Sequence, residues 1–325
     1  MPREPSQTLL ERAGETAAGL GSLGAGRPRA RRALEIGVVA LAVAFLAAFV
    51  ATQWSRLPDY DWQFRPLWLV LSAFGVALFY AIQCEAWRAI LRSLGETLDA
   101  RTARAIWAKS LVARYVPTNA LMVVGRVVMA ERHGVGKRAC LASIVYEAGL
   151  AVATAVMVGA YFVITLPRLA DQPERYAILV VIPLALAVLH PRVFRRLADF
   201  ALGKLGRGGL PAVLPPGRVL ELALVYLVGW AAMGLGVAGF AAALHPLQGE
   251  DVAYAAAAYP VAFCAAVVTF VIPGGVGTRD AALAVSLAAV LPGTVATAIA
   301  VGFRIFQTVI ELTYVGVVTA LGRSR

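Results

Sequence analysis

The chain has 325 residues, of which 60% are hydrophobic and 15% charged, and its formal net charge is +11 at pH 7. A mean hydropathy of +0.73 lies outside the range of soluble globular domains, so the lipid bilayer is the expected solvent. The positive charge does not indicate nucleic-acid binding, because the basic residues lie between apolar runs and not on one clustered face.

Lipid offers no partner to exposed backbone polar groups, so spanning segments are either helices or strands of a closed barrel. The long Ala, Val and Leu runs lack the alternation of barrel strands. We therefore predict an all-α, polytopic, multi-pass protein of the cell membrane. The three cysteines lie far apart without the spacing of metal ligands, and we expect no metal and no cofactor.

The first segment, residues 1–33, is rich in Gly, Ala, Arg and Glu and has no helical or strand period. We expect a disordered cytoplasmic tail there, followed by a single transmembrane domain over 34–322. A spanning helix needs roughly 20 apolar residues. The candidate runs are 36–54, 67–90, 139–165, 175–190, 219–244, 252–272, 277–291 and 294–321.

These runs predict about eight spans, with broken or re-entrant helices among them. The run 277–291 would be only about 22 Å long at 1.5 Å per residue, so it is either a span or a re-entrant segment. Lys and Arg concentrate in alternate connections, at 27–32, 88–138, 192–218 and 323–325. Because positive residues are retained on the cytoplasmic side, both termini are predicted to be cytoplasmic.

Two stretches depart from simple spans. Residues 100–130 combine an Arg-bearing amphipathic segment, a break around Pro117 and Asn119, and another apolar run. A hairpin entering from the cytoplasmic face fits this pattern best, and a span is the alternative. Residues 192–208 are basic and amphipathic. They are interpreted either as an interfacial helix attracted to anionic headgroups or as a solvated cytoplasmic linker.

The most informative segment for function is 271–280, where a helix breaker and glycines are followed at once by charges. Irregular backbone at membrane depth survives only where protein buries it or where it lines a polar cavity. The start of the next half-helix then offers N–H groups and a positive dipole end to an anion. The alternative is a structural kink with a local ion pair. The residues concerned are Pro273, Gly274, Gly275, Gly277, Arg279 and Asp280.

Arg304 and Glu311 lie seven residues apart in the last apolar run, near one face of a helix. Each would cost about 2.5–3.5 kcal/mol at the bilayer centre on insertion scales, so such residues are functional candidates. The alternative is a structural ion pair between helices. In the first half, a break, Arg126 and then Glu147 repeat the order of break, arginine and carboxylate. Paired interrupted segments in the two halves of a transporter point to a central site.

We therefore predict a substrate-binding set of Arg126, Glu147, Gly274, Gly275, Gly277, Arg279, Asp280, Arg304 and Glu311. The chain resembles the lysylphosphatidylglycerol synthase transmembrane family at Pro117, Gly125-Arg126, the stretch around Arg132, Glu147, the segment from Pro273 to Asp280, and Arg304. That family is also called flippase-like and includes the membrane half of the multiple peptide resistance factor. The resemblance covers roughly residues 35–322. It is most specific in the segment from Pro273 to Arg279 with Arg304 further along.

The chain departs from the family pattern at two positions. Family members usually have Gly-Glu where this chain has Gly125-Arg126, and Glu where it has Asp280. The first departure could alter the preference for headgroup charge. The resemblance implies that the protein moves a lipid with a charged or glycosylated headgroup between leaflets. It does not imply the synthase reaction, which resides in a separate soluble transferase domain of this family. We therefore expect no enzyme activity in this chain.

Our first hypothesis is a lipid translocase for anionic or polyprenyl-linked membrane lipids, working beside an envelope-lipid biosynthetic enzyme as partner. Arg126, Arg279 and Arg304 would attract a phosphate, while the carboxylates would orient these arginines or bind a cationic part of the headgroup. One alternative is a polyprenol-dependent membrane glycosyltransferase whose Asp59 and Asp61 hold a divalent metal. The other is a non-transporting scaffold that holds an envelope-lipid enzyme through its basic cytoplasmic faces.

Overall fold

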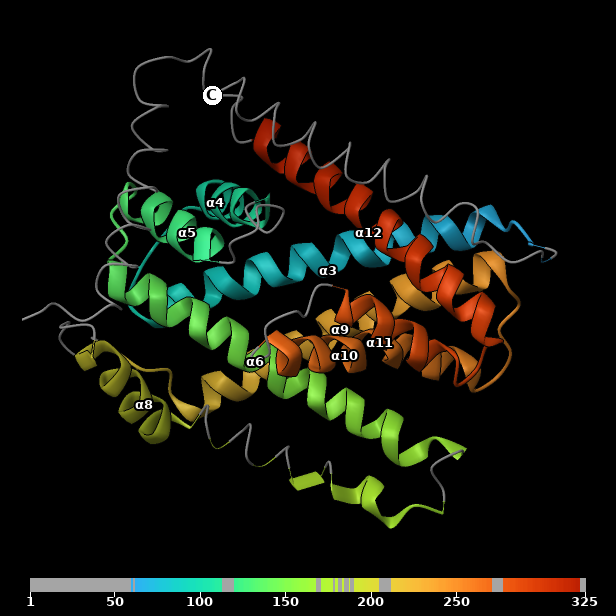
Figure 1. Ribbon diagram of the computed structural model, residues 1–325. Coiled ribbons are helices and arrows are strands. Elements are labelled where there is room, and N and C mark those ends of the chain that lie inside the picture. Colours follow the sequence, from blue (N-terminus) through green and yellow to red (C-terminus); the bar gives the residue numbers. More distant parts are fainter. Residues whose placement is uncertain are drawn as a thin grey trace, which may run out of the picture.

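The computed structural model describes most of the chain from residue 60 onward. The described residues are 60, 62–112, 120–167, 171–177, 179–180, 183, 187, 190–204, 212–270 and 277–321. The predicted tail 1–33 and the first run 36–54 lie outside them. Within the described part, every regular element is a helix (Figure 1). The predicted all-α class is therefore confirmed for this part of the chain.

Four helices are long and apolar enough to cross a membrane: α3 (Pro66–Ser93), α6 (Lys137–Thr165), α9 (Pro216–Leu244) and α12 (Gly293–Leu321). They confirm the predicted runs 67–90, 139–165, 219–244 and 294–321. The apolar helix α10 (Asp251–Phe270) covers most of the run 252–272 and contains Pro260. The protein is thus a polytopic membrane protein. The total of about eight spans stays a prediction, since in 175–190 the structure describes only η3 (Pro173–Ala177) and isolated residues.

Proline and glycine set several helix ends. Pro66 and Pro216 each stand at the first position of a helix, where the missing N–H costs nothing and φ is already helical. Gly95 follows α3 with a φ of +86°, a conformation that glycine adopts without strain. α6 ends at Thr165, and the next residue, Leu166, is extended because a residue before a proline, here Pro167, avoids the helical region.

Helices α3 and α9 pack against each other through small residues. A methyl group at Gly75 would lie 2.6 Å from the carbonyl oxygen of Ala232 and 2.8 Å from the nitrogen of Gly236. The hydroxyl of Ser72 donates to the carbonyl of Gly236 at 2.5 Å. Small residues and side-chain hydrogen bonds are the usual means by which helices associate in lipid, where the hydrophobic effect supplies no drive.

Two helical hairpins complete the bundle. In the first, α4 (Ala100–Val112) packs on α5 (Ala120–Glu131), as the pattern over 100–130 predicted. In the second, α10 packs on α11 (Thr278–Leu287). The segments that join each pair, 113–119 and 271–276, lie outside the described residues. α11 has ten residues, about 15 Å, which is too short to cross a hydrocarbon core roughly 30 Å thick.

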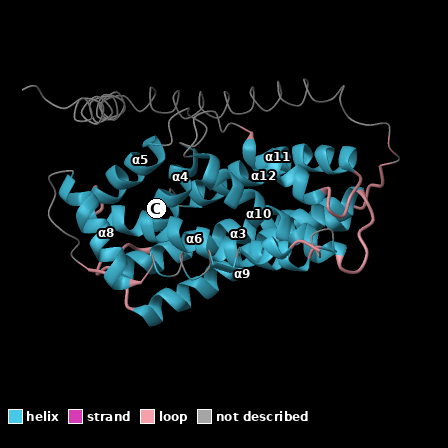
Figure 2. Ribbon diagram, turned by 60° about the horizontal axis from the view of Figure 1, so that its bottom comes forward, coloured by secondary structure: helices cyan, strands magenta, loops and turns pink. Residues whose placement is uncertain are grey.

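Figure 1 shows α12 crossing α3, and α12 also contacts α4 and α11. Figure 2, turned by 60° from that view, shows the described helices packed in one bundle and joined by loops. The basic segment 192–208 contains a helix, α8 (Pro191–Lys204), whose Phe194 is buried and stacks on Tyr146 with ring centroids 3.7 Å apart. Arg195 and Arg196 on the same helix are exposed. This part of the chain is therefore an anchored amphipathic helix.

Candidate functional site

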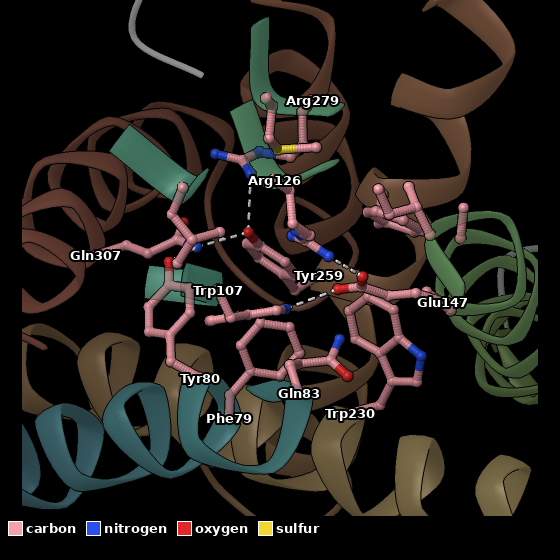
Figure 3. A pocket seen from close by; sticks show the side chains of 16 residues that line it. Phe79, Tyr80, Gln83, Trp107, Arg126, Glu147, Trp230, Tyr259, Arg279 and Gln307 are labelled. Atoms are coloured by element: carbon pink, nitrogen blue, oxygen red, sulfur yellow. Dashed lines mark hydrogen bonds and ion pairs between the residues drawn. The ribbon is translucent and has the colours of Figure 1, made fainter. Parts of the chain in front are cut away.

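A cavity of about 230 Å³ lies inside the bundle (Figure 3). Trp230 and Gln307 line it from positions near the middle of α9 and α12. The cavity thus lies about halfway along the spanning helices, where transporters bind their substrates. The lining residues are Phe79, Tyr80, Gln83, Trp107, Leu111, Met122, Arg126, Ile144, Glu147, Ala148, Ala151, Trp230, Tyr259, Phe263, Arg279 and Gln307.

Arg126 on α5 lines one part of the cavity and is almost fully enclosed, with 2% of its surface exposed. Its Nη1 donates to Glu147 Oε2 on α6 in an ion pair, and its Nε donates to the Ser110 hydroxyl at 3.0 Å. The guanidinium lies 5.3 Å from the ring centroid of Trp87 and 5.8 Å from that of Trp107. Such aromatic contacts favour a cation in a dry environment.

Glu147 is engaged on both carboxylate oxygens. Oε2 accepts from Arg126, and Oε1 accepts a hydrogen bond of 3.0 Å from Trp107 Nε1. The charge of Arg126 on α5 is thus balanced by the carboxylate of Glu147 on the next helix, α6. This geometry agrees with the order of break, arginine and carboxylate seen in the sequence.

Arg279 enters the cavity from the first turn of α11. Gly277 precedes this helix with a φ of +90°, a left-handed conformation that favours glycine. Arg279 Nη1 donates to the Tyr259 hydroxyl at 2.9 Å, and its guanidinium lies 5.3 Å from the Tyr259 ring centroid. Asp280 Oδ1 lies 3.7 Å from Arg279 Nη2. The left-handed turn therefore aims a cation of the second hairpin at the same cavity that Arg126 lines.

A chain of hydrogen bonds links Arg279 to Glu311 on α12. Gln307 Nε2 donates to the hydroxyls of Tyr259, at 2.8 Å, and of Tyr80, at 3.1 Å. The Tyr80 hydroxyl donates to Glu311 Oε2 at 2.5 Å. Because Tyr80 gives its only hydrogen to the carboxylate, the Gln307 atom that faces it must be the amide nitrogen. The amide orientation of Gln307 is therefore determined by its neighbours.

The predicted site residues fall into four groups. Arg126, Glu147 and Arg279 line the cavity, and Glu311, 2% exposed, is connected to it through Tyr80. Asp280 and Gly277 flank Arg279 without being lining residues. Arg304, on α12, is not part of the lining, and its binding role stays a prediction. Gly274 and Gly275 lie outside the described residues.

Sequence reasoning missed the uncharged polar and aromatic part of the wall. Gln83 and Gln307 stand inside the apolar runs 67–90 and 294–321, and Tyr259 stands inside 252–272. A glutamine within a spanning run is a usable signal, because its amide needs partners that lipid does not supply. The aromatic residues carry no such signal, because an apolar ring can face either lipid or the protein interior.

The acidic pair of the glycosyltransferase alternative, Asp59 and Asp61, lies outside the described residues. Tyr60 between them is described, and its hydroxyl lies 2.5 Å from Nδ1 of His245 at the end of α9. Among the residues with described positions, no cluster of three or more His, Cys, Asp or Glu side chains is placed to hold a metal ion.

The comparison with known families covers nearly the whole bundle. The family model described as lysylphosphatidylglycerol synthase TM region matches residues 32–314, which include both hairpins and every residue that lines the cavity. No curated protein and no solved structure matches the chain. Because the match extends over more than half of the sequence, the chain belongs to the lysylphosphatidylglycerol synthase TM region family.

Proposed function

We propose that this protein moves a lipid with a charged or glycosylated headgroup across the cytoplasmic membrane, with the headgroup passing through the cavity. The observation that carries this proposal is the meeting of Arg126 from α5 and Arg279 from α11 at one cavity halfway along the spanning helices. The family is associated with membrane lipid handling, which agrees with this proposal.

The cavity is suited to a headgroup and not to a whole lipid. At about 230 Å³ it is smaller than the roughly 300–1,000 Å³ of pockets that enclose drug-sized ligands. The acyl or isoprenoid tails would therefore stay in the bilayer while the headgroup is in the cavity. Arg279 lies in the first turn of α11, where the helix dipole adds to its positive charge and favours a phosphate. The proposal keeps the orientation predicted from the Lys and Arg distribution, with both termini on the cytoplasmic side.

The proposal can be tested with purified protein in liposomes that contain a trace of fluorescent phosphatidylglycerol. Dithionite bleaches only the outer-leaflet fluorophore, so a translocase increases the bleached fraction beyond the outer-leaflet share. Arg279→Gln removes a charge-assisted hydrogen bond of about 1.5–3 kcal/mol and should slow bleaching at least tenfold. Arg195→Gln, on the exposed face of α8, should leave the rate unchanged.

Both variants must first show the unfolding midpoint of the wild type. If folded Arg279→Gln moves lipid as fast as the wild type, the cavity is not the route. If the folded wild type moves no anionic or glycosylated lipid, the translocase is excluded. Loss of partner binding in Arg195→Gln would then favour the scaffold, because that hypothesis assigns function to the exposed arginines.

A further inference from the structure

We infer that the cavity recognises a neutral, hydroxyl-bearing ring in the headgroup, as in a hexose or a cyclic polyol, and that the amide of Gln83 contacts its hydroxyls. This inference rests on the proposed function, because it names the substrate class for the same cavity. It follows from which polar groups of the wall are already engaged, from the amide that remains, and from the aromatic rings around it (Figure 3).

The charged groups of the wall are engaged within the protein. Arg126 pairs with Glu147, and Nη2 of Arg279 lies 3.7 Å from Oδ1 of Asp280. A carboxylate thus stands beside each of these two arginines, and opposite charges this close largely compensate each other. Charge alone therefore gives the wall little selectivity among headgroups. The linking phosphate that the proposed function places near Arg279 is common to all phospholipids.

Gln83 differs from these engaged groups. It stands inside α3 and lines the cavity, and only 8% of its surface is exposed. Its Oε1 accepts no hydrogen bond from any residue that the structure describes. A buried amide without a partner costs free energy, so such groups are almost always bonded to protein, water or a ligand. Gln83 is therefore placed to bond a polar ligand in the cavity.

A hydroxyl group matches the Gln83 amide because each of them both donates and accepts. The last torsion of a glutamine is broad, so the amide can turn its oxygen or its nitrogen toward the ligand. Tyr259 adds a second contact for a hydroxyl. Its oxygen accepts from Arg279 Nη1 and Gln307 Nε2, which leaves its own hydrogen to donate to a ligand oxygen. Both contacts are uncharged, so a neutral hydroxyl satisfies them without leaving a charge unpaired.

Aromatic rings form much of the remaining wall, and they favour a ring-shaped ligand. Phe79, Trp107, Trp230 and Phe263 all line the cavity, and the ring centroids of Trp230 and Phe263 lie 5.1 Å apart. The indole N–H groups of both tryptophans already donate to other side chains, so their apolar surfaces remain for a ligand. The C–H groups of a sugar or cyclic polyol can cover such a ring while the hydroxyls at the edge reach the amide and the tyrosine.

Phospholipids with the same phosphodiester charge separate hydroxyl recognition from charge. Phosphatidylethanol has no headgroup hydroxyl, phosphatidylglycerol has an open-chain polyol, and phosphatidylinositol has a polyol ring. We expect the full-length protein in phosphatidylcholine nanodiscs to bind phosphatidylinositol about tenfold more tightly than phosphatidylethanol, with phosphatidylglycerol between them, as measured by native mass spectrometry. Equal binding of all these lipids would overturn the inference, and continued movement of lipid in liposomes would then leave the translocase intact. Movement of none of them would instead overturn the proposed function.

Gln83→Leu tests the amide directly, and Gln172→Leu, at an exposed glutamine, is the matched control. Gln83→Leu should lower the affinity for phosphatidylinositol about tenfold, to that for phosphatidylethanol, while the control keeps the preference of the wild type. Because the Gln83 oxygen has no partner in the described structure, its removal should not lower the unfolding midpoint of the lipid-free protein. A lower midpoint with an unchanged lipid preference would overturn the inference and assign Gln83 to the fold.

A last arm distinguishes a lipid from a free polyol phosphate. Soluble inositol 1-phosphate carries the same ring and phosphate without acyl chains. We expect it to compete with phosphatidylinositol only at far higher concentration, because the tails add membrane partitioning to the affinity. Competition at equal concentration would overturn the assignment of a lipid and identify the ligand as a soluble cyclic polyol phosphate.

Discussion

Arg126 and Glu147 form an ion pair between α5 and α6 in which the side chains are only 3% and 17% exposed. A buried pair of this kind contributes little net stability, but removal of one partner leaves an uncompensated charge. The pair thus couples the first broken-helix hairpin to a spanning helix at the wall of the cavity.

The first prediction concerns this pair. Arg126→Gln and Glu147→Gln should each lower the free energy of unfolding by about 3 kcal/mol, because each leaves one charge without its partner. The double variant should cost less than the sum of the two, since neither charge remains. Unfolding of the purified protein in nanodiscs measures the three values, and additive costs would show that the pair is not coupled.

The second prediction concerns the link between α3 and α12. Tyr80→Phe removes the hydroxyl that donates to Glu311 and accepts from Gln307, and should cost about 1–3 kcal/mol of stability. The matched control is Tyr161→Phe, because Tyr161 is 49% exposed. An equal fall of the thermal unfolding midpoint in both variants would contradict a stabilising role of the buried Tyr80 hydroxyl.

The third prediction tests the close approach of α3 and α9. Gly75→Ala places a methyl group 2.6 Å from the Ala232 carbonyl oxygen, so the helices must separate, at a cost of about 1–3 kcal/mol. Gly316→Ala, where the structure describes no atom within 4 Å, should be neutral or stabilise the helix by up to about 1 kcal/mol. The two variants are compared by unfolding midpoint, and similar losses would argue against the tight contact.

The fourth prediction concerns the turn before Arg279. Gly277→Ala should cost about 1–2 kcal/mol, because a side chain disfavours its left-handed backbone. No atom of the described residues lies within 4 Å of the added methyl group, so a clash with that part of the chain does not contribute. Gly277→Asn should cost less, since asparagine tolerates this conformation better. Unfolding measurements and phosphatidylglycerol binding should change together, and an equal loss for both variants would exclude the backbone explanation.

The fifth prediction is a pH dependence at the start of α4. Hydrogen bonds from the Thr102 side chain and from the backbone N–H groups of Thr102 and Arg101 hold the pKa of Asp99 below its ordinary value of 3.8. A lowered pKa stabilises the fold above the ordinary value, and this contribution is lost as the pH falls through the lowered one. Asp99→Ala should therefore cost about 1 kcal/mol at pH 7.

The cost of Asp99→Ala should shrink as the pH falls from 3.8 toward the lowered pKa, because the carboxyl of the unfolded chain is protonated first and that of the folded chain only at the lowered pKa. Asp99→Asn provides the control, because an asparagine can cap a helix without a charge. Denaturant titrations at several pH values measure both differences. A cost that is independent of pH would show that the charged form contributes nothing.

The sequence by itself determined the membrane class, the four long helices, the helix pair within 100–130 and three charged residues of the cavity wall. Lipid satisfies no backbone group, so every apolar run of sufficient length has to be helical. A charged side chain is also costly in lipid, so a charged residue inside such a run is expected to face the protein interior or a polar cavity. The residues Arg126, Glu147 and Arg279 are therefore visible as site candidates without any structure.

Only the tertiary structure decided which residues meet. Tyr80 and Glu311 are 231 residues apart in the sequence. They come together because α3 and α12 cross, and because each helix is rotated about its own axis so that these two side chains face each other. That rotation depends on packing contacts such as Gly75 against α9, which hydropathy does not encode. It also brings Gln83, Tyr259 and Gln307 to the cavity and leaves Arg304 outside its wall. Helix rotation is a property of the whole packed bundle, and a single run of sequence does not contain it.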